Sequence, residues 1–256
     1  MGSLLTFDLG NTHLTLGWWR EQELCATWRL STQVDETADE YGVKLYQLLD
    51  AIGGFKENCH AVGCSVVPSL ESTLAAAAQR YLNVKLIWLT AADVGIPIKY
   101  DPPESVGRDR LVNMRAAKER FRQPVIVVDF GTATTVDALS RQGVYVGGAI
   151  MAGIETAAQT LWKRAARLAA IDLDVVPETM LGQNTTDSMR AGLVWGAALA
   201  VDGAVERIWQ ELGETTPVVA TGGLSALVCR CMNHVDAVEP ELTLRGLMLS
   251  AQDLVL

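Results

Sequence analysis

The sequence is short of positive charge. Its 21 lysine and arginine residues are outnumbered by 30 aspartate and glutamate residues, which gives a formal net charge of −9. A nucleic-acid-binding surface needs a basic patch, so this composition argues against a nucleic-acid partner. It does not argue against a bound nucleotide, because local N–H groups, a lysine or arginine and metal ions decide such a site.

Long apolar runs are also missing. No charge-free stretch is long enough to span a bilayer, and no signal peptide is recognisable, so we expect no membrane association. The five cysteines are odd in number and lack the spacing of zinc ligands; they are Cys25, Cys59, Cys64, Cys229 and Cys231. We therefore expect reduced thiols in a cytoplasmic protein.

One stretch, Val125–Asp137, organises the rest of the chain. It begins with an apolar, β-branched run that predicts a buried strand ending at Asp129. Gly131 then permits a tight turn, and three threonine hydroxyls follow; these belong to Thr132, Thr134 and Thr135. A carboxylate, a glycine turn and hydroxyl groups could cradle phosphate oxygens and a metal ion. An ordinary hairpin turn with a polar tip is the alternative.

The stretch Leu4–Leu16 repeats this pattern with Asp8, Gly10, Asn11 and Thr12. The two aspartates are 121 positions apart, and each turn runs into a second apolar segment, so both stretches predict β-hairpins. Two similar hairpins half a chain apart indicate two related lobes. Two phosphate-binding turns on opposite sides of a cleft could hold a polyphosphate, which suits ATP better than a single anion.

The segments between the hairpins predict an α/β protein. We expect a first lobe over residues 1–120 and a second over residues 121–256. The predicted first-lobe elements are strands at Glu23–Leu30, His60–Val67 and Val84–Leu89, a helix around Tyr41–Leu49, and a helix at Leu70–Leu82 capped by Ser69. The predicted second-lobe elements are a strand from Gly143, helices from Ile154 and Asn184, a strand and Gly-Gly turn at Pro217–Ser225, and a closing helix from Glu241.

Two of these segments carry further expectations. The alanine- and glycine-rich continuation Gly192–Trp209 predicts a tightly packed core helix. The Gly-Gly turn of Pro217–Ser225 is a candidate nucleotide-base or ribose loop, although such turns after strands are common.

The segment Gly107–Arg110 precedes a stretch of helix-forming composition. Asp109 would then lie near a helix N-terminus, where the helix dipole favours a carboxylate and an anionic ligand. A carboxylate beside two arginines suits a base next to a carboxylate-binding site. A helix-terminal Asp109 paired with Arg108 or Arg110 is the simpler alternative on these residues alone.

Taken together, these motifs resemble the type III pantothenate kinases over nearly the whole chain. The resemblance rests on their joint order; the segments are Asp8–Thr12, Trp28–Thr32, Ser65–Pro68, Gly107–Arg110 with Asn113, Asp129–Thr135, Gly147–Ile150, Asn184–Thr185 and Thr221–Gly223. It implies the actin-like ATPase fold, with two ribonuclease H-like lobes and a nucleotide cleft between them. It also implies phosphorylation of pantothenate by ATP, the first step of coenzyme A synthesis.

The resemblance also implies roles for individual residues. Asp109 matches the general base, Asp129 the ligand of a monovalent cation, K⁺ or NH₄⁺, and Thr132 an ATP contact. The ATP phosphate loop corresponds to Asp8, Leu9, Gly10, Asn11, Thr12, His13, Leu14 and Thr15. Pantothenate-binding positions correspond to Tyr100, Gly107, Arg108, Asp109, Arg110 and Thr185, the last reaching across a homodimer interface in relatives. Asp8 and Asp129 could gather Mg²⁺ and the monovalent cation.

Two departures from the family pattern flank the substrate-binding residues. Ala152 stands where the family usually has proline before Gly153, and Ala165–Ala169 replaces a Thr-Ala-x-Leu-Pro segment. Both predict a looser loop and helix there.

Two other functions stay open. One is a non-catalytic regulatory or accessory role on the same scaffold, since fold does not fix function. The other is phosphorylation of a different small hydroxylated substrate by a sugar or acetate-type kinase. Retention of Asp8, Asp109 and Asp129 argues against the first alternative, and Gly107–Arg110 argues against the second only through the resemblance.

Overall fold

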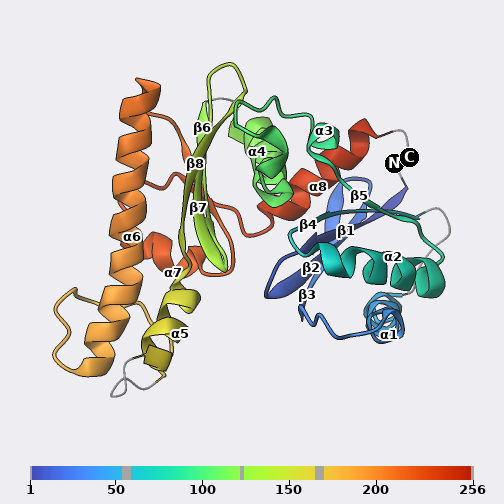
Figure 1. Ribbon diagram of the computed structural model, residues 1–256, viewed down its shortest axis with the longest axis horizontal. Helices are drawn as coiled ribbons and strands as arrows, with labels where there is room; N and C mark the ends of the chain where they lie inside the picture. The colour runs from blue at the N-terminus through green and yellow to red at the C-terminus, as the bar shows by residue number, and fades with distance from the viewer. Residues whose placement is uncertain (1, 54–58, 122–123, 165–169, 255–256) are drawn as a thin grey trace. The chain divides into compact units, whose positions relative to one another are not determined.

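The computed structural model describes residues 2–53, 59–121, 124–164 and 170–254. The elements of the first half are, in chain order (Figure 1), β1 (Ser3–Leu9), β2 (His13–Arg20), β3 (Glu23–Ser31), α1 (Ala38–Asp50), β4 (Cys59–Ser65), α2 (Pro68–Leu82), β5 (Leu86–Trp88), α3 (Ala91–Val94), the 3₁₀ turn η1 (Pro103–Ser105) and α4 (Arg108–Phe121). None of the helices within the described ranges is long and apolar enough to cross a bilayer.

The second half repeats this alternation. Its elements are β6 (Val125–Phe130), β7 (Ala133–Leu139), β8 (Tyr145–Ala152), α5 (Ile154–Arg164), α6 (Thr185–Leu212), β9 (Val218–Thr221), α7 (Ser225–Val228), the 3₁₀ turn η2 (Cys229–Cys231), β10 (Ala237–Val238) and α8 (Leu242–Asp253).

Both sheets have the same strand order. The first runs β3-β2-β1-β4-β5 and the second, read from its other edge, β8-β7-β6-β9-β10. In each sheet the first three strands pair antiparallel and the last two join in parallel. The predicted duplication of a hairpin-led lobe is therefore confirmed at the level of topology, and so is the predicted α/β class of two ribonuclease H-like lobes.

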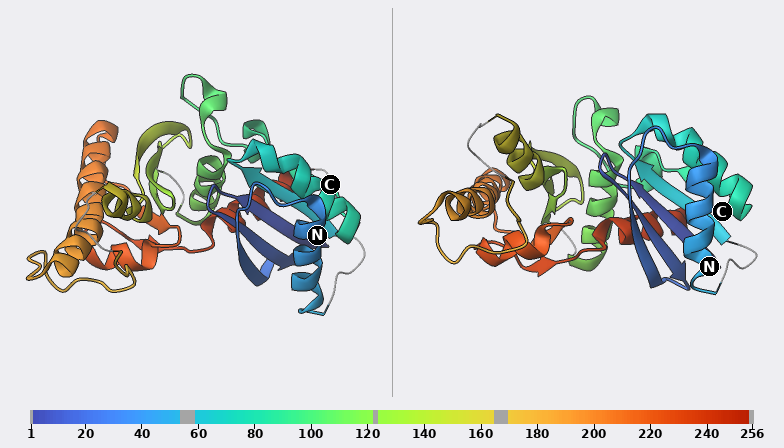
Figure 2. Two further views of the ribbon diagram at one scale, coloured as in Figure 1. Left: turned by 60° about the horizontal axis from the view of Figure 1, so that its bottom comes forward. Right: turned by 90° about the horizontal axis from the view of Figure 1, so that it is seen from below.

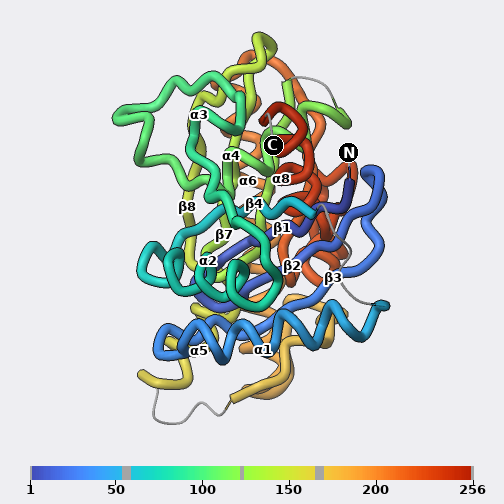
Figure 3. Tube along the Cα trace, turned by 90° about the vertical axis from the view of Figure 1, so that its right-hand side faces the viewer, coloured from blue at the N-terminus to red at the C-terminus, as the bar shows by residue number. Residues whose placement is uncertain are grey.

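Strand β1 is buried on both faces, since Leu4 and Thr6 on one face are as inaccessible as Leu5 on the other. Leu5, Phe7 and Leu9 form one core with residues of α1 and α2. These two helices lie side by side (Figure 3), and Gly42 of α1 gives the room that the Tyr81 ring of α2 occupies. Since successive side chains of a strand alternate, Asp8 lies on the opposite face from this core.

The chain divides into two compact units. The first comprises Met1–Ile96, Asp101–Ala116 and Thr243–Leu256, and the second comprises Pro97–Tyr100 and Ala117–Leu242. These units differ from a division after residue 120, because the closing helix α8 groups with the first sheet and a short strap groups with the second.

The placement of α8 has a physical cause in its contact with α4. Any side chain at Gly246 would collide with the carbonyl oxygen of Val112, so the two helices approach closely only at a glycine. Thr243 Oγ1 donates to Asn113 Oδ1 over 2.7 Å. A 2.7 Å ion pair between Arg115 and Asp253 adds a second polar link.

In the second unit, α5 and α6 pack against one face of the sheet (Figure 2). Helix α6 buries one stripe of side chains in this core; the stripe includes Val194, Ala198, Val201 and Val205. The opposite side carries Gly192, Gly196 and Gly203, where an added Cβ would meet nothing within 4 Å, and Leu199, which is 52% exposed. The predicted core helix is therefore confirmed for one face of α6, and the opposite face lies outside this core.

One predicted helix cap was wrong, and one cap was not predicted. Helix α2 begins with Pro68 and has no side-chain cap, so Ser69 is not its N-cap. Proline suits this first position because its missing N–H has no helical partner there. Helix α1 is capped by Thr37, whose reciprocal bonds with Glu40 form a capping box that the sequence analysis did not identify.

Candidate functional site

The turn of the first hairpin lies between β1 and β2. Gly10 N donates to His13 O over 2.9 Å and closes the turn, while Asn11 and Thr12 are exposed at its tip. Nη2 of Arg29, on the neighbouring strand, lies 2.9 Å from His13 Nδ1. Because a guanidinium can only donate, this contact makes Nδ1 an acceptor and fixes a cation beside the turn.

The other residues of the predicted ATP loop lie on the two strands. Leu9 and Leu14 are fully buried in the first core, so only their backbone can face a ligand. Asp8 and Thr15 are partners in the β1–β2 register, and both side chains are half-buried.

Cys64 lies beside Asp8 and was not identified from the sequence. The parallel register of β1 and β4 pairs these two residues, and Cys64 Sγ donates to Asp8 Oδ1 over 3.4 Å. The pKa of this thiol is raised well above its ordinary value, chiefly because burial penalises the thiolate and further because the carboxylates of Asp8 and Asp109 are near. Cys64 therefore stays a neutral donor at physiological pH. Its electrostatic contact with both carboxylates brings Asp8 and Asp109 to one side of the first unit.

Asp109 lies in the first turn of α4, as predicted. An added Cβ at Gly107 would stand well inside van der Waals distance of Asp109 Oδ1, so glycine at 107 makes room for this carboxylate. Oδ1 itself is shielded from solvent. Arg110 is buried with 8% of its surface exposed, whereas Arg108 is half-buried. Arg108 thus offers more surface to a ligand than Arg110 does.

Asp129 is the penultimate residue of β6, which ends at Phe130, one residue later than predicted. It is the register partner of Thr221 on the parallel strand β9. Gly222 follows with φ of +93°, and an added Cβ there would lie 2.5 Å from Asp129 Oδ1. The Gly-Gly turn predicted as a base or ribose loop therefore makes room for the Asp129 carboxylate. Gly131 N donates to Ala133 O over 3.2 Å and closes the second hairpin.

The carbonyl of Thr132 holds this hairpin to the segment that follows β8. It accepts from Gly153 N over 3.2 Å and from Thr156 Oγ1 over 2.8 Å. Ala152, the first departure from the family pattern, ends β8 immediately before this contact. The hairpin connection is therefore present despite Ala152. The second departure, Ala165–Ala169, lies outside the described residues.

Thr134 does not belong to the turn, contrary to the expectation of three hydroxyls there. It is 2% exposed within β7, and among the described residues its Oγ1 has no hydrogen-bond partner. The cause is strand alternation, which directs positions 134 and 136 towards the core. Thr132 alone is exposed at the tip of the hairpin.

Tyr100, predicted to contact substrate, belongs to the strap Pro97–Tyr100 of the second unit. The strap pairs with β8 through Lys99 N to Tyr145 O and Tyr145 N to Pro97 O, both 2.8 Å. The Tyr100 ring packs against the Tyr145 ring at 6.1 Å, and the Tyr145 hydroxyl donates to buried Asp137 Oδ1 over 2.8 Å. Tyr145 and Asp137 therefore support Tyr100, and their separation in sequence explains why neither was identified.

Thr185 is the exposed first residue of α6. Asn184 caps this helix by accepting from Asp187 N over 2.9 Å, which agrees with the predicted start. The first unit thus holds Asp8–Thr15 and Gly107–Arg110, and the second holds Tyr100, Asp129, Thr132 and Thr185.

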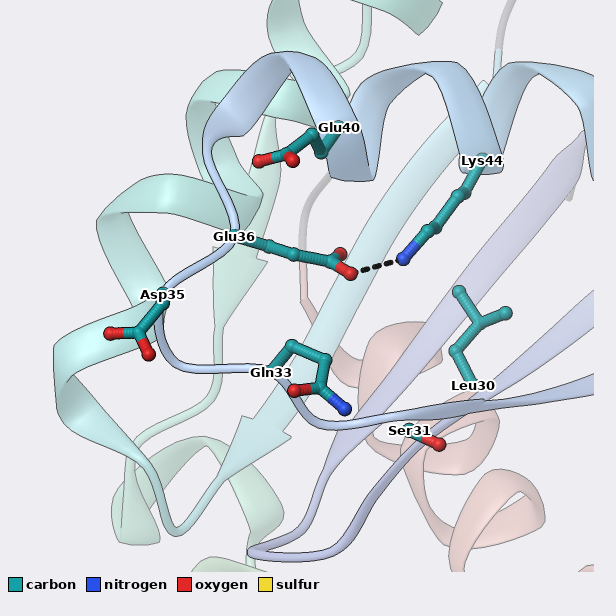
Figure 4. Close-up of a pocket in the computed structure, with 7 residues that line it drawn as sticks. All are labelled: Leu30, Ser31, Gln33, Asp35, Glu36, Glu40 and Lys44. Carbon is teal, nitrogen blue, oxygen red and sulfur yellow. Dashed lines mark hydrogen bonds and ion pairs between the residues drawn. The ribbon is translucent and has the colours of Figure 1, made fainter.

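A separate hollow of about 470 Å³ lies where β3 leads into α1 (Figure 4). Its lining is Leu30, Ser31, Gln33, Asp35, Glu36, Glu40 and Lys44. Three of these side chains are carboxylates, and the single lysine is paired with Glu36. This hollow is therefore poorly suited to a phosphate.

Solved structures first define the fold. The chain superposes with a TM-score of 0.62 and 19% identity on a Campylobacter jejuni protein provisionally described as a Baf family transcriptional activator, covering 97% of this chain and 98% of that one. The activator of 2-hydroxyisocaproyl-CoA dehydratase from Clostridium difficile, with bound ADPNP, matches with a TM-score of 0.56 and 12% identity over 98% and 95% of the two chains. These similarities show that the chain shares the two-lobed α/β fold of these proteins.

Sequence comparison then gives the family. The family model for type III pantothenate kinase matches residues 4–207. The type III pantothenate kinase of Thermomicrobium roseum is 44% identical over 246 residues, 95% of each chain, and that of Moorella thermoacetica is 42% identical over 96% of this chain and 97% of its own. The chain belongs to the type III pantothenate kinase family.

Proposed function

We propose that this protein transfers the γ-phosphoryl group of ATP to the primary hydroxyl of pantothenate, giving 4′-phosphopantothenate for coenzyme A synthesis. Phosphoryl transfer needs mainly positioning and charge neutralisation. Asp8–Thr15 and Thr132 bind the nucleotide, Gly107, Arg108 and Arg110 with Tyr100 and Thr185 bind pantothenate, and Asp109 accepts the hydroxyl proton.

The observation that supports this proposal best is the grouping of Asp8 and Asp109 around Cys64. This grouping links the first hairpin turn, which suits phosphate, to the start of α4, which carries the candidate base Asp109. A hydrogen-bonding arginine near that base can hold the carboxylate of pantothenate while the hydroxyl approaches Asp109.

Oxygen ligands in both hairpins suit hard cations. Among the described residues there is no group of three or more His, Cys, Asp or Glu side chains that could hold a metal. Mg²⁺ is commonly held by one or two carboxylates together with substrate phosphates, which suits Asp8. Asp129 beside Thr221, with Gly222 leaving room for its carboxylate, offers oxygens for K⁺ or NH₄⁺. Both cations would neutralise charge on the transferring phosphoryl group.

We expect the rate to depend on the monovalent cation. Activity after desalting should be low in sodium-only buffer and should rise on addition of potassium or ammonium. Asp129→Asn should blunt this rise, because it removes a charged ligand. Equal rates in sodium and potassium would contradict the assignment of Asp129.

We also propose that the working unit is a homodimer in the cytoplasm. The open face of α6 supports self-association, because Leu199 is exposed between glycines that leave space for a partner. Thr185 begins the same helix, so a partner on α6 would lie near a predicted substrate-binding residue. The five free cysteines agree with a reducing compartment.

The experiment that tests the substrate is a panel of acceptors with ATP. Pantothenate, sugars, acetate and glycerol are each incubated with the protein, Mg²⁺ and K⁺, and the products are identified by mass spectrometry. We expect a phosphorylated product from pantothenate alone. Phosphorylation of a sugar or acetate in preference to pantothenate would assign the protein to a different substrate class.

A further inference from the structure

We propose that Thr32 is a positioning residue that orients the backbone N–H groups of the first hairpin towards the ATP phosphates, an inference that rests on the proposed nucleotide-binding role of Asp8–Thr15. Thr32 is the first residue after β3. Its backbone N donates to Thr12 O over 2.9 Å, and its Oγ1 donates to Gly10 O over 2.7 Å. One residue thus holds the two carbonyls that lie before and after Asn11 in the turn.

Because the peptide bond is planar, a hydrogen bond that holds a carbonyl also sets the direction of the next residue's N–H group. The two contacts of Thr32 therefore set the directions of two N–H donors. In a trans peptide the carbonyl and the following N–H lie in one plane and point in opposite directions. Fixing Gly10 O therefore fixes the direction of Asn11 N–H, and fixing Thr12 O fixes that of His13 N–H. Both N–H groups are directed away from Thr32. Preorganised backbone donors of this kind are what an anion-binding turn requires.

Thr32 is itself anchored to the core of the first unit. The next residue, Gln33, donates from its backbone N to Tyr41 Oη over 2.9 Å, and the Tyr41 hydroxyl donates to Gln33 O over 3.1 Å. Tyr41 lies in α1 and is fully buried. The hairpin is thereby connected, through two residues, to a side chain that cannot move without disturbing the core.

The second unit has a corresponding contact with different chemistry. Gly153, the first residue after β8, donates from its N to Thr132 O, just as Thr32 N does to Thr12 O. A side chain at 153 would collide with the carbonyls of Gly131 and Thr132, so the hydroxyl is supplied by Thr156, which donates to Thr132 O over 2.8 Å. Two hairpins of one duplicated fold are held at equivalent positions, which indicates that holding the turn is part of its function.

Thr32→Val tests the role of the hydroxyl because it keeps the side-chain shape and the backbone N–H but removes the Oγ1 donor. We expect the Kd for ATP, measured by calorimetry, to rise about five- to tenfold, the scale of one hydrogen bond. The KM for pantothenate and the melting temperature should change little. Thr32→Ser, which restores the donor, should bind ATP nearly as the wild type does.

Two further variants complete the experiment. Thr27→Val is a matched control, because Thr27 is an exposed residue of the same strand, paired with Gly17 away from the turn. Tyr41→Phe removes the anchoring hydroxyl and should also weaken ATP binding. This variant tests the inference if Thr32→Val does not fold.

Three results would overturn the inference. These are an unchanged Kd for ATP in Thr32→Val, equal losses in Thr32→Val and Thr32→Ser, and equal weakening of both substrates together with a lowered melting temperature. Failure of the wild type to bind ATP is a different result, which would reject the proposed function and with it this role of Thr32.

Discussion

Gly107 gives the sharpest test at the scale of single residues. A methyl group at 107 would displace Asp109 Oδ1, the far end of a rotatable side chain, so we expect a shift of the carboxylate rather than loss of the fold. Gly107→Ala should lower kcat at least tenfold, because small misplacement of a catalytic group is costly. The melting temperature and the Kd for ATP should stay near the wild-type values. A normal kcat in Gly107→Ala would mean that the position of Asp109 is not critical.

The sequence allowed prediction of site residues that directly follow a strand. It did not allow prediction of residues that contact each other across neighbouring strands. Asp8 and Asp129 could be located because an apolar run, a carboxylate and glycine are adjacent in the chain. Cys64 and Tyr145 act on residues 56 and 45 positions away, through strand register that becomes known only when the sheets form. Thr32 belongs to the segment Trp28–Thr32 that carries part of the family resemblance, but its bonds to Gly10 and Thr12 could not be foreseen from composition.

At the scale of elements, the capping box of α1 predicts a measurable loss of stability. Thr37 Oγ1 accepts from Glu40 N over 3.3 Å, and Glu40 Oε2 accepts from Thr37 N over 2.7 Å. Thr37→Ala should lower the free energy of unfolding by about 1 kcal/mol in urea titration, whereas Thr37→Ser should change it little. An unchanged midpoint in Thr37→Ala would contradict this role.

The same contact has a pH dependence with a defined sign. The hydrogen bond from the Thr37 backbone is the main cause that lowers the pKa of Glu40. A depressed carboxyl pKa contributes stability above the ordinary pKa of glutamate and loses it as the pH falls through the lowered value. The difference between wild type and Glu40→Gln, which has no titrating carboxyl at this position, should therefore be complete at neutral pH and should narrow in acid.

The sequence largely predicted which segments form helices and which form strands. It predicted less well the residues at which they begin and end. Periodicity gave β3, α2 and β8 close to their observed positions because their burial patterns are local. The predicted start of α2 was wrong because the helix begins with Pro68 and has no side-chain cap of the kind that Ser69 was expected to supply. The core packing of α6 was predicted, but its alanine and glycine content did not reveal which face enters the core.

At the scale of the whole molecule, the grouping of α8 with the first sheet was beyond the reach of sequence reasoning. The contact at Gly246 joins α8 to Val112 of α4, across more than half of the chain. A division into consecutive halves assumes that residues close in sequence belong to the same unit. A helix at the end of the chain can instead group with the first sheet. The duplication itself was predictable, because each copy carries the same strand–Asp–Gly pattern.

Self-association is the prediction that belongs to this scale. Leu199→Arg places a charge on the open face of α6 without entering the core, so it should raise the dimer dissociation constant at least tenfold. Sedimentation velocity over a concentration series measures this. Val43→Arg, at an exposed position of α1, serves as the control. A fully active wild-type monomer at assay concentration would reject the homodimer.

The central claim, a kinase that uses Asp109 to phosphorylate pantothenate, is tested most directly by pantothenate-dependent ADP release with Mg²⁺ and K⁺ present. The wild type should release ADP only when pantothenate is added. Asp109→Asn preserves the shape of the side chain and removes the basic oxygen, so its kcat should fall by about 10²-fold or more while the Kd for ATP stays nearly constant. Absence of pantothenate-dependent ADP release by the wild type, or near-normal kcat in Asp109→Asn, would contradict the account.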